Sequence, residues 1–141
     1  MRTGLLMAHL RGAAKRATYR DTHPFVRNFA GRSWLIAHNG DLKDYEPKLH
    51  SAFRPVGTTD SERAFCWLMQ ELAKAHAGVP GIGELTHTLR ELLPVPAAHG
   101  TFNLLLSNGQ ALWAHCSSAL QFVERAYPFG HATLADEDLS I

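Results

Sequence analysis

The sequence predicts an α+β fold with a mainly antiparallel sheet, and the order of its apolar patterns is the main reason. Strand-like apolar runs come first, at residues 4–10 and 32–40, and two stretches with helical spacing follow them. Further strand-like runs come after the helices, and such separation of strands from helices is typical of α+β folds. The length of 141 residues corresponds to a single domain, residues 1–141.

The first part of the chain is predicted to contain two strands and two loops. Residues Gly4–Leu10 (GLLMAHL) are predicted to form a buried strand, because nearly all of them are apolar. A polar, basic loop follows and ends at Pro24, and Arg32–Gly40 (RSWLIAHNG) is predicted to form a second strand and its turn. Residues 41–59 contain two prolines and a glycine, which predicts a loop.

The later part predicts two helices and a hairpin. Between Asp60 and Ala77, apolar residues recur at helical spacing and form one stripe that would face a core. A second helix is predicted at Ile82–Leu93, where the sequence Pro-Val-Pro stops it. Two strand-like runs then meet at Ser107-Asn108-Gly109, and Asn-Gly favours the positive φ angles of a type I′ hairpin turn. Residues 119–126 and 130–135 are predicted to form further strands.

The composition argues against several classes of protein. The formal net charge is +1, so there is no basic excess that would favour nucleic acid. No apolar run approaches the roughly 18 residues of a membrane span, and no signal peptide is predicted. Cys66 and Cys116 lie in apolar contexts, which favours a reducing, cytoplasmic location over a disulfide framework.

The start of the first predicted helix has two interpretations. Thr59 and Glu62 have the spacing of a capping box, and Asp60 would then be a first-turn carboxylate that the helix dipole favours. In the alternative interpretation, Asp60 is a fixed anion that binds the amine of a ligand. Taken alone, this stretch favours the cap.

Three other places in the sequence also have a structural and a functional interpretation. Arg11 is either an edge residue that reaches water or a fork that binds a ligand carboxylate. Asn39 and Gly40 form either a simple turn or two N–H donors of an oxyanion hole. His23 precedes a proline and is therefore extended, and it either shapes a pocket or is an ordinary loop histidine.

Taken in order, the motifs AHLR, THPF, WLIAHNG and GTTDSE resemble those of the class II glutamine amidotransferases, which belong to the N-terminal-nucleophile hydrolases. The later FNLLLSNG, CSS and PFGHATLADEDL are similar to the stand-alone bacterial branch of that family. The resemblance covers the chain from about Leu6 onwards, and the joint order is far more specific than any single motif. It implies a four-layer αββα sandwich, in which helices cover two antiparallel sheets.

The resemblance also implies roles for the residues singled out above. Arg11 would bind the α-carboxylate of L-glutamine, Asp60 its α-amino group, and His23 would contribute to substrate binding. Asn39 and Gly40 would hold the oxyanion formed when the side-chain amide is attacked. The family reaction hydrolyses glutamine to glutamate and ammonia through a cysteine thioester. No metal or cofactor is implied, and the acceptor of the ammonia stays open.

The sequence departs from the family pattern in ways that affect activity. The family nucleophile is an N-terminal cysteine activated by its own amino group, whereas this chain begins Met1-Arg2-Thr3. Ala14 stands where some relatives carry a hydroxyl or amide side chain. Segments that relatives have before AHLR and after ADEDLSI are absent, which predicts an incomplete domain. We therefore expect a chain that is inactive alone, with exposed edges that self-associate or take strands from a partner chain.

Two alternatives stay open. Nine histidines favour a metal-binding protein, but no pair has a tight ligand spacing and the cysteines do not cluster with them. In the second alternative, the chain is a non-catalytic remnant that serves as a glutamine-binding or scaffold module. Neither Cys66 nor Cys116 is expected to replace the nucleophile, because buried structural cysteines are usually inert.

Overall fold

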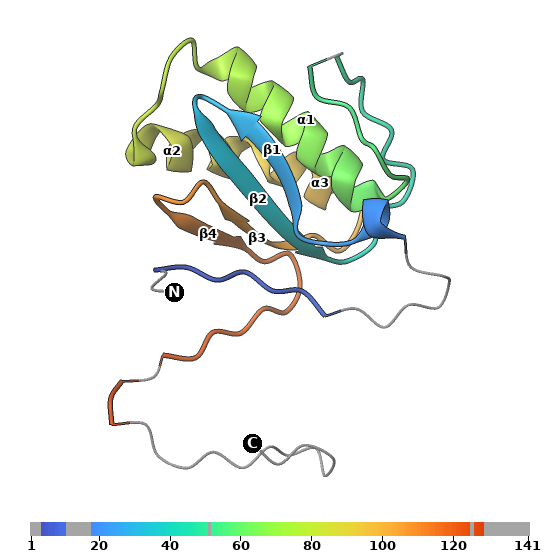
Figure 1. Cartoon of the computed structure of the whole chain (residues 1–141). Helices are drawn as coiled ribbons and strands as arrows, with labels where there is room; N and C mark the ends of the chain where they lie inside the picture. The colour runs from blue at the N-terminus through green and yellow to red at the C-terminus, as the bar shows by residue number, and fades with distance from the viewer. Residues whose placement is uncertain (1–3, 11–17, 51, 125, 129–141) are drawn as a thin grey trace.

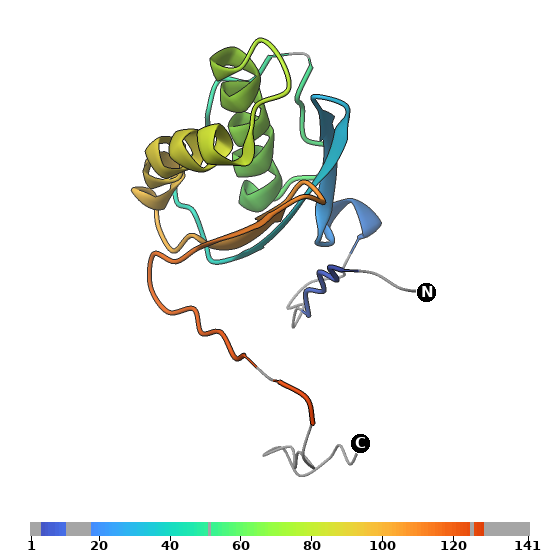
Figure 2. The same cartoon turned by 90° about the vertical axis from the view of Figure 1, so that its left-hand side faces the viewer.

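The computed structural model describes residues 4–10, 18–50, 52–124 and 126–128. Its centre is a four-stranded antiparallel sheet in the order β1-β2-β3-β4, and the helices cover one face of this sheet (Figures 1 and 2). The predicted α+β class with an antiparallel sheet is confirmed. One helix layer on one sheet layer corresponds to half of the four-layer sandwich that the family resemblance implies.

Two hairpins joined by a long connection build the sheet. β2 and β3 pair antiparallel from Leu35↔Ser107 to Asn39↔Asn103, so residues 40–102, including the main helices, connect the two central strands. The strands are β1 (Phe25–Phe29), β2 (Arg32–Asn39), β3 (Asn103–Ser107) and β4 (Leu112–His115).

The type I′ turn lies in the first hairpin rather than the second. Ala30 and Gly31, which connect β1 to β2, have φ angles of 52° and 71°, and this turn type requires positive φ at both positions. β1 is not predicted from the sequence. The turn that follows it has alanine at its first central position, where type I′ turns usually have Asn, Asp or Gly, so the sequence does not mark a hairpin here. In the second hairpin, Gly109 has a φ of 82° but Asn108 does not have a positive φ, and its side chain accepts two backbone hydrogen bonds instead. That hairpin is confirmed, but its predicted turn type is wrong.

The helices lie close to their predicted positions. α1 spans Asp60–Ala75 and α2 spans Ile82–Leu92. Pro-Val-Pro ends α2 but then begins one further helical turn, α3 (Pro94–Ala97), since proline is tolerated in the first turn of a helix. A single 3-10 turn, η1 (Tyr19–Asp21), precedes β1, and the predicted loop between β2 and α1 is confirmed over its described residues.

The core lies between the helices and one face of the sheet. Alternate residues of β2 point into it, and the apolar stripe of α1 covers Trp34 and Ile36, which are 1% and 0% exposed. Trp34 stacks on Trp113 of β4 with ring centroids 5.8 Å apart, so the core reaches the edge of the sheet. The other large side chains that are fully buried include Phe65, Leu68, Met69, Leu72, Leu85, Leu89, Phe102, Leu104 and Leu106.

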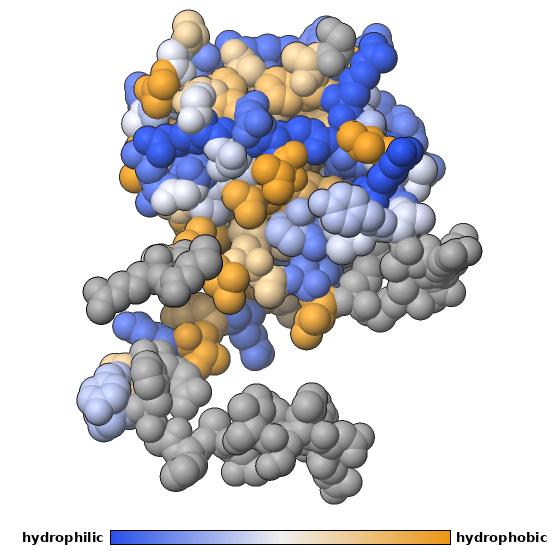
Figure 3. Space-filling model, viewed as in Figure 1, coloured by the Kyte–Doolittle hydropathy of each residue, from blue (hydrophilic) through white to orange (hydrophobic). Residues whose placement is uncertain are grey.

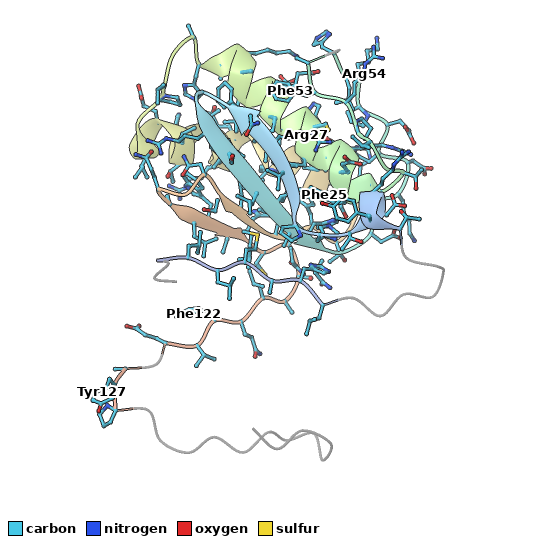
Figure 4. The ribbon with its side chains drawn as sticks, viewed as in Figure 1. Phe25, Arg27, Phe53, Arg54, Phe122 and Tyr127 are labelled. Atoms are coloured by element: carbon cyan, nitrogen blue, oxygen red, sulfur yellow. The ribbon has the colours of Figure 1, made fainter. Side chains whose placement is uncertain are left out.

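Two of the predicted strands are wrong. Residues 4–10 form no strand, and Leu6 and Leu10 are 83% and 99% exposed. Residues 119–124 form no strand either, and Phe122 stands away from the sheet in Figure 4. An apolar run becomes a strand only when a neighbouring strand takes up its backbone hydrogen bonds along its length, and neither segment is a strand of the four-stranded sheet. Residues 130–135, predicted as a strand, lie outside the described residues.

The face of the sheet opposite the helices is apolar and partly open. Register places Val26, Leu35 and Leu112 in one row on this face, and Val26 and Leu112 are each 48% exposed. The N-terminal segment, residues 4–10, passes this face without forming a strand, and a cavity of about 770 Å³ lies between the segment and the sheet. Figure 3, seen from this side, shows apolar surface among polar residues.

The start of α1 is fixed by a cap and by a buried carboxylate. Thr59 Oγ1 accepts a hydrogen bond from the Glu62 N–H at 3.2 Å, as predicted. The reciprocal half of the predicted capping box is wrong, because the Glu62 carboxylate accepts from the Val56 and Gly57 N–H groups, at 3.0 and 2.7 Å, and from the Arg27 guanidinium. Glu62 is 1% exposed, and these donors offset the cost of burying its charge.

Arg27 connects the loop before α1 to the sheet. Besides its contact with Glu62, its guanidinium donates to the Arg54 carbonyl oxygen at 3.1 Å, and Figure 4 shows Arg27 on β1 facing this loop. The same loop is held further along by the Gln70 side chain, which bonds to the backbone of Lys48 and His50. The loop that leads into the site is therefore fixed at several points.

We expect Thr59→Ala to lower the free energy of unfolding by about 0.5–2 kcal/mol, because the Glu62 N–H loses its acceptor. Thr59→Ser keeps the hydroxyl and is expected to remain close to wild type. Urea denaturation followed by far-ultraviolet circular dichroism measures both. Equal losses in the two variants would show that the threonine methyl group, not the cap, stabilises the helix start.

Candidate functional site

Two glycines create the corner at the end of β2. Gly40 has a φ of 153°, and a Cβ placed on it would lie 1.8 Å from the Thr101 carbonyl oxygen. A Cβ on Gly100 would lie 2.1 Å from the Asp41 carbonyl oxygen. Only glycine allows two backbones to approach this closely. The chain therefore turns sharply after Asn39, and both Asn39 and Gly40 are exposed.

Asp60 lies beside this corner. The N–H of Leu42 donates to Asp60 Oδ2 at 2.8 Å, and Leu42 also pairs with Gly100 in an isolated bridge. The carboxylate is half-buried in the first turn of α1, where the end of the helix favours a negative charge. Asn39, Gly40 and Asp60, which come from two separate sequence motifs, thus lie at neighbouring places in the structure.

His38 is buried directly beneath the corner and is not a predicted site residue. Its Nε2 lies 3.1 Å from the Thr101 carbonyl oxygen and its Nδ1 lies 2.7 Å from Ser61 Oγ. A carbonyl oxygen only accepts, so Nε2 carries the proton and Nδ1 accepts from the Ser61 hydroxyl. Burial lowers the pKa of His38, which favours this neutral form. The alternation along β2, which places His38 on the core face with Ile36, is the signal that would have identified it.

His23 lies in a stack of rings at the entrance to β1. Its ring centroid is 4.4 Å from that of His9 and 4.5 Å from that of Phe25. Burial is the main cause that lowers the pKa of His38, and the charge of His9 lowers it further, so His9 also lies near His38. The N-terminal segment therefore approaches the site at this end of the sheet.

Arg11, predicted to bind the glutamine carboxylate, and Ala14, which replaces the hydroxyl or amide side chain of some relatives, lie outside the described residues. Cys66 is buried within α1, and burial raises the pKa of its thiol. Cys116 is exposed just after β4, and both cysteines are free thiols. The predicted inertness of a buried cysteine therefore applies to Cys66 but not to Cys116.

Asn103 anchors the segment that follows β4. Its Oδ1 accepts from the N–H groups of Ser117 and Ser118, at 3.0 and 3.2 Å, and its Nδ2 donates to Ser118 Oγ at 2.8 Å. Because Asn103 pairs with Asn39 in the sheet, this segment, which includes Cys116, is held at the same end of the sheet as the corner. An asparagine at the start of an otherwise apolar strand-like run, Asn103 in FNLLLSNG, is the sequence signal that could have identified this anchor.

The large cavity on the open face is separate from this corner. Its lining combines the N-terminal segment with residues of β2 and of the β3–β4 turn, and Asn39, Gly40 and Asp60 are not among them. Among the described residues, no three His, Cys, Asp or Glu side chains converge on a position that could hold a metal ion. In the same part of the chain, no helix is long and apolar enough to cross a membrane.

The arrangement suits a small ligand with a positive group and a polar oxygen. The Asp60 carboxylate, still able to accept hydrogen bonds, can pair with an ammonium group. Asn39 and Gly40 are exposed at the neighbouring corner, and a side-chain amide and a backbone N–H are donors of the kind that stabilise an oxygen that gains negative charge.

The whole chain, residues 1–141, matches the family model of the class II glutamine amidotransferases. The chain belongs to this family. It is 41% identical over 145 residues to "Putative glutamine amidotransferase YafJ" of Escherichia coli (strain K12), a match that covers 96% of this chain and 54% of that relative. It is 34% identical over 148 residues to "Uncharacterized protein MJ1515" of Methanocaldococcus jannaschii, covering 100% of this chain and 41% of the relative.

The fold of the chain is also similar to that of a solved structure from this family. The crystal structure of a "predicted glutamine amidotransferase from Pseudomonas aeruginosa PA01" superposes with a TM-score of 0.78 and 42% identity, over 85% of this chain and 47% of that one. The resemblance that the sequence motifs indicate is therefore confirmed. This amidotransferase chain spans about half the length of the relatives it matches.

We expect Gly40→Ala to lower the free energy of unfolding by about 1–3 kcal/mol, because its Cβ would overlap the Thr101 carbonyl oxygen and the backbone would have to shift. Gly78→Ala is the matched control, since nothing lies within 4 Å of a Cβ at that position. Chemical denaturation of both variants measures the difference. Equal effects would show that the close approach at Gly40 does not constrain the fold.

Proposed function

We propose that the corner and Asp60 bind L-glutamine, and that the chain is the glutamine-recognition part of an enzyme that hydrolyses the glutamine side-chain amide. The observation that carries this proposal is the 2.8 Å hydrogen bond from the Leu42 N–H to Asp60 Oδ2, which holds a carboxylate beside the exposed Asn39–Gly40 corner. Free glutamine offers an ammonium group to the carboxylate and an amide oxygen to the corner. Membership of the glutamine amidotransferase family supports this substrate.

Each residue has a defined role in this proposal. Asp60 pairs with the α-amino group of glutamine, and Asn39 and Gly40 stabilise the oxyanion. Removal of one oxyanion donor typically lowers turnover about 10²–10³-fold. Arg11 binds the α-carboxylate as a bidentate fork. The stack of His9 on His23 supports this role, because it brings the chain two residues before Arg11 to the site.

The nucleophile of the family is an N-terminal cysteine, and we propose that the 141-residue chain tested alone binds glutamine without releasing ammonia. Cys66 is buried in α1, and burial raises the pKa of its thiol, which disfavours the reactive thiolate. Loss of the nucleophile from a catalytic unit costs on the order of 10⁶ in rate. We place the protein in the cytoplasm, since free thiols persist in reducing compartments.

We expect Asp60→Asn to weaken glutamine binding at least tenfold, because the amide oxygen can still accept from the Leu42 N–H while the charge that pairs with the ammonium is lost. Arg11→Ala is expected to weaken binding similarly. Isothermal titration calorimetry with L-glutamine measures both affinities, and an ammonia assay on the same samples is expected to stay at background.

Two variants serve as controls. Asp44→Asn makes the same chemical change at an exposed loop position whose positive φ asparagine tolerates, and Arg90→Ala removes an exposed arginine of α2. Both are expected to bind glutamine as the wild type does. Unchanged affinity in Asp60→Asn would remove Asp60 from the site. Ammonia release that Cys116→Ser abolishes would overturn the proposal that the chain is inactive alone.

We further propose that the open apolar face of the sheet packs against additional strands, either from a second copy or from a partner chain. Val26 and Leu112 are both 48% exposed in one row of this face, and exposed apolar surface of this kind favours association. The relatives, about twice as long, contain more chain that could cover such a face.

We expect the 141-residue chain to sediment as a dimer or larger species at micromolar concentration, and Val26→Lys combined with Leu112→Lys to shift it to monomer. Val79→Lys, at an exposed position between α1 and α2, is the matched control and is expected to leave the assembly unchanged. Sedimentation velocity measures all three. A monomeric wild type would argue against self-association through this face.

A further inference from the structure

His38 is a buried residue that contacts the neighbours of both Asp60 and the Asn39–Gly40 corner. Its ring spans from Ser61, next to Asp60 at the start of α1, to Thr101, which precedes β3. It is 2% exposed, and its Nε2 lies 2.8 Å from the point that a Cβ on Gly40 would occupy. His38 therefore contacts the supports of both ligand-facing groups while being nearly closed to solvent.

The link to Thr101 acts on Gly40. The Thr101 carbonyl oxygen accepts a hydrogen bond from His38 Nε2 at 3.1 Å. The same oxygen packs so closely against Gly40 that a Cβ there would lie 1.8 Å from it. A carbonyl that is held by a hydrogen bond fixes the peptide beside it. The direction of the Gly40 N–H, which is the proposed oxyanion donor, thus depends on a contact that His38 maintains.

The link to Ser61 acts on Asp60. The Ser61 hydroxyl can donate only one hydrogen bond. It donates this bond to His38 Nδ1, 2.7 Å from Ser61 Oγ, rather than to Asp60 Oδ1, which is 3.5 Å away. Asp60 Oδ1 is therefore left available to a ligand ammonium. If His38 is protonated, Nδ1 becomes a donor, and the Ser61 proton must turn towards Asp60 Oδ1, where it competes with the ligand.

We infer that His38 is a positioning residue for glutamine, whose neutral ring orients the Gly40 donor through Thr101 and keeps Asp60 available through Ser61. This inference rests on the proposed function. It predicts that glutamine affinity is constant above the pH at which His38 titrates and falls at lower pH, since only the neutral ring can accept from Ser61.

The charged groups around the ring act in both directions. Asp60 in α1 and Asp41 in the corner favour protonation of His38, whereas burial, the largest influence, and His9 of the N-terminal segment oppose it. The net result is a pKa below the ordinary histidine value, so the neutral ring prevails at pH 7. His115 of β4, which packs on Phe102, also has a pKa lowered by burial, and it provides a control.

The two links can be separated by substitution. His38→Asn keeps an acceptor near the Nδ1 position but cannot reach Thr101, whereas His38→Gln keeps a donor near the Nε2 position but loses the acceptor for Ser61. In calorimetry with L-glutamine at pH 7.5, chosen as about one unit above the ordinary histidine pKa, we expect at least tenfold weaker binding for His38→Asn. We expect His38→Gln to bind at pH 7.5 about as weakly as the wild type binds with His38 protonated, because the Ser61 proton then faces Asp60 Oδ1 at every pH, and to show no further fall in affinity at lower pH.

His115→Gln is the matched control and is expected to retain both the affinity and its pH dependence. Thermal melting of each variant shows whether a loss of affinity merely follows a loss of stability. Wild-type affinity in His38→Asn, or an unchanged pH dependence in His38→Gln, would overturn the inference.

A ligand-free measurement separates this inference from the proposed function. In ¹⁵N–¹H spectra of the wild type, the Gly40 amide resonance is expected to shift with pH in parallel with the His38 ring nitrogens, and this shift should disappear in His38→Gln. If glutamine does not bind the wild type but the coupled shift is present, the substrate assignment fails and the positioning role stands. A Gly40 resonance that does not follow the His38 titration refutes the positioning role whatever the ligand.

Discussion

The near contact between two stretches of backbone, residues 40–42 and 99–101, is the constraint on which the site depends. Gly40 and Gly100 each lie where a Cβ would overlap the carbonyl oxygen of the other stretch. This approach directs the Leu42 N–H towards Asp60 and allows the bridge between Leu42 and Gly100. The end of β2, the start of α1 and the start of β3 are thereby held close together. The candidate ligand-binding groups come from the end of β2 and the start of α1.

Two carboxylates in the first turn of α1 have different tasks because their surroundings differ. Glu62 is buried, and backbone N–H groups with Arg27 satisfy it, so it fixes the loop that enters the helix. Asp60 is half-buried and has one strong backbone donor, so it keeps the capacity to accept from a ligand. A recognition site needs this combination, since a charge that binds a ligand must be held rigidly without being fully neutralised.

The two faces of the sheet differ in how much of their apolar surface is covered. One face is covered by α1 and α2, whereas Val26 and Leu112 on the other face are half exposed and the N-terminal segment passes it without forming a strand. Relatives of about twice the length, and a solved homologue matched over 47% of its chain, carry additional sequence. The candidate site thus lies at one end of a sheet whose second face is partly open.

Much of this architecture follows from local sequence. The apolar stripe of α1, the cap at Thr59, the strand Arg32–Asn39 and the motif order that marks the glutamine amidotransferase family depend on short-range pattern and are recognisable without coordinates. What depends on long-range contacts could not be predicted: whether the apolar run at 4–10 finds a pairing partner, and which N–H groups the Glu62 carboxylate accepts from. His38 also belongs to this second group, because a histidine in a strand acquires its role only when folding places Thr101 on one side of its ring and Ser61 on the other. Periodicity and capping are properties of neighbouring residues, whereas partners far apart in the sequence are chosen by the packed chain as a whole.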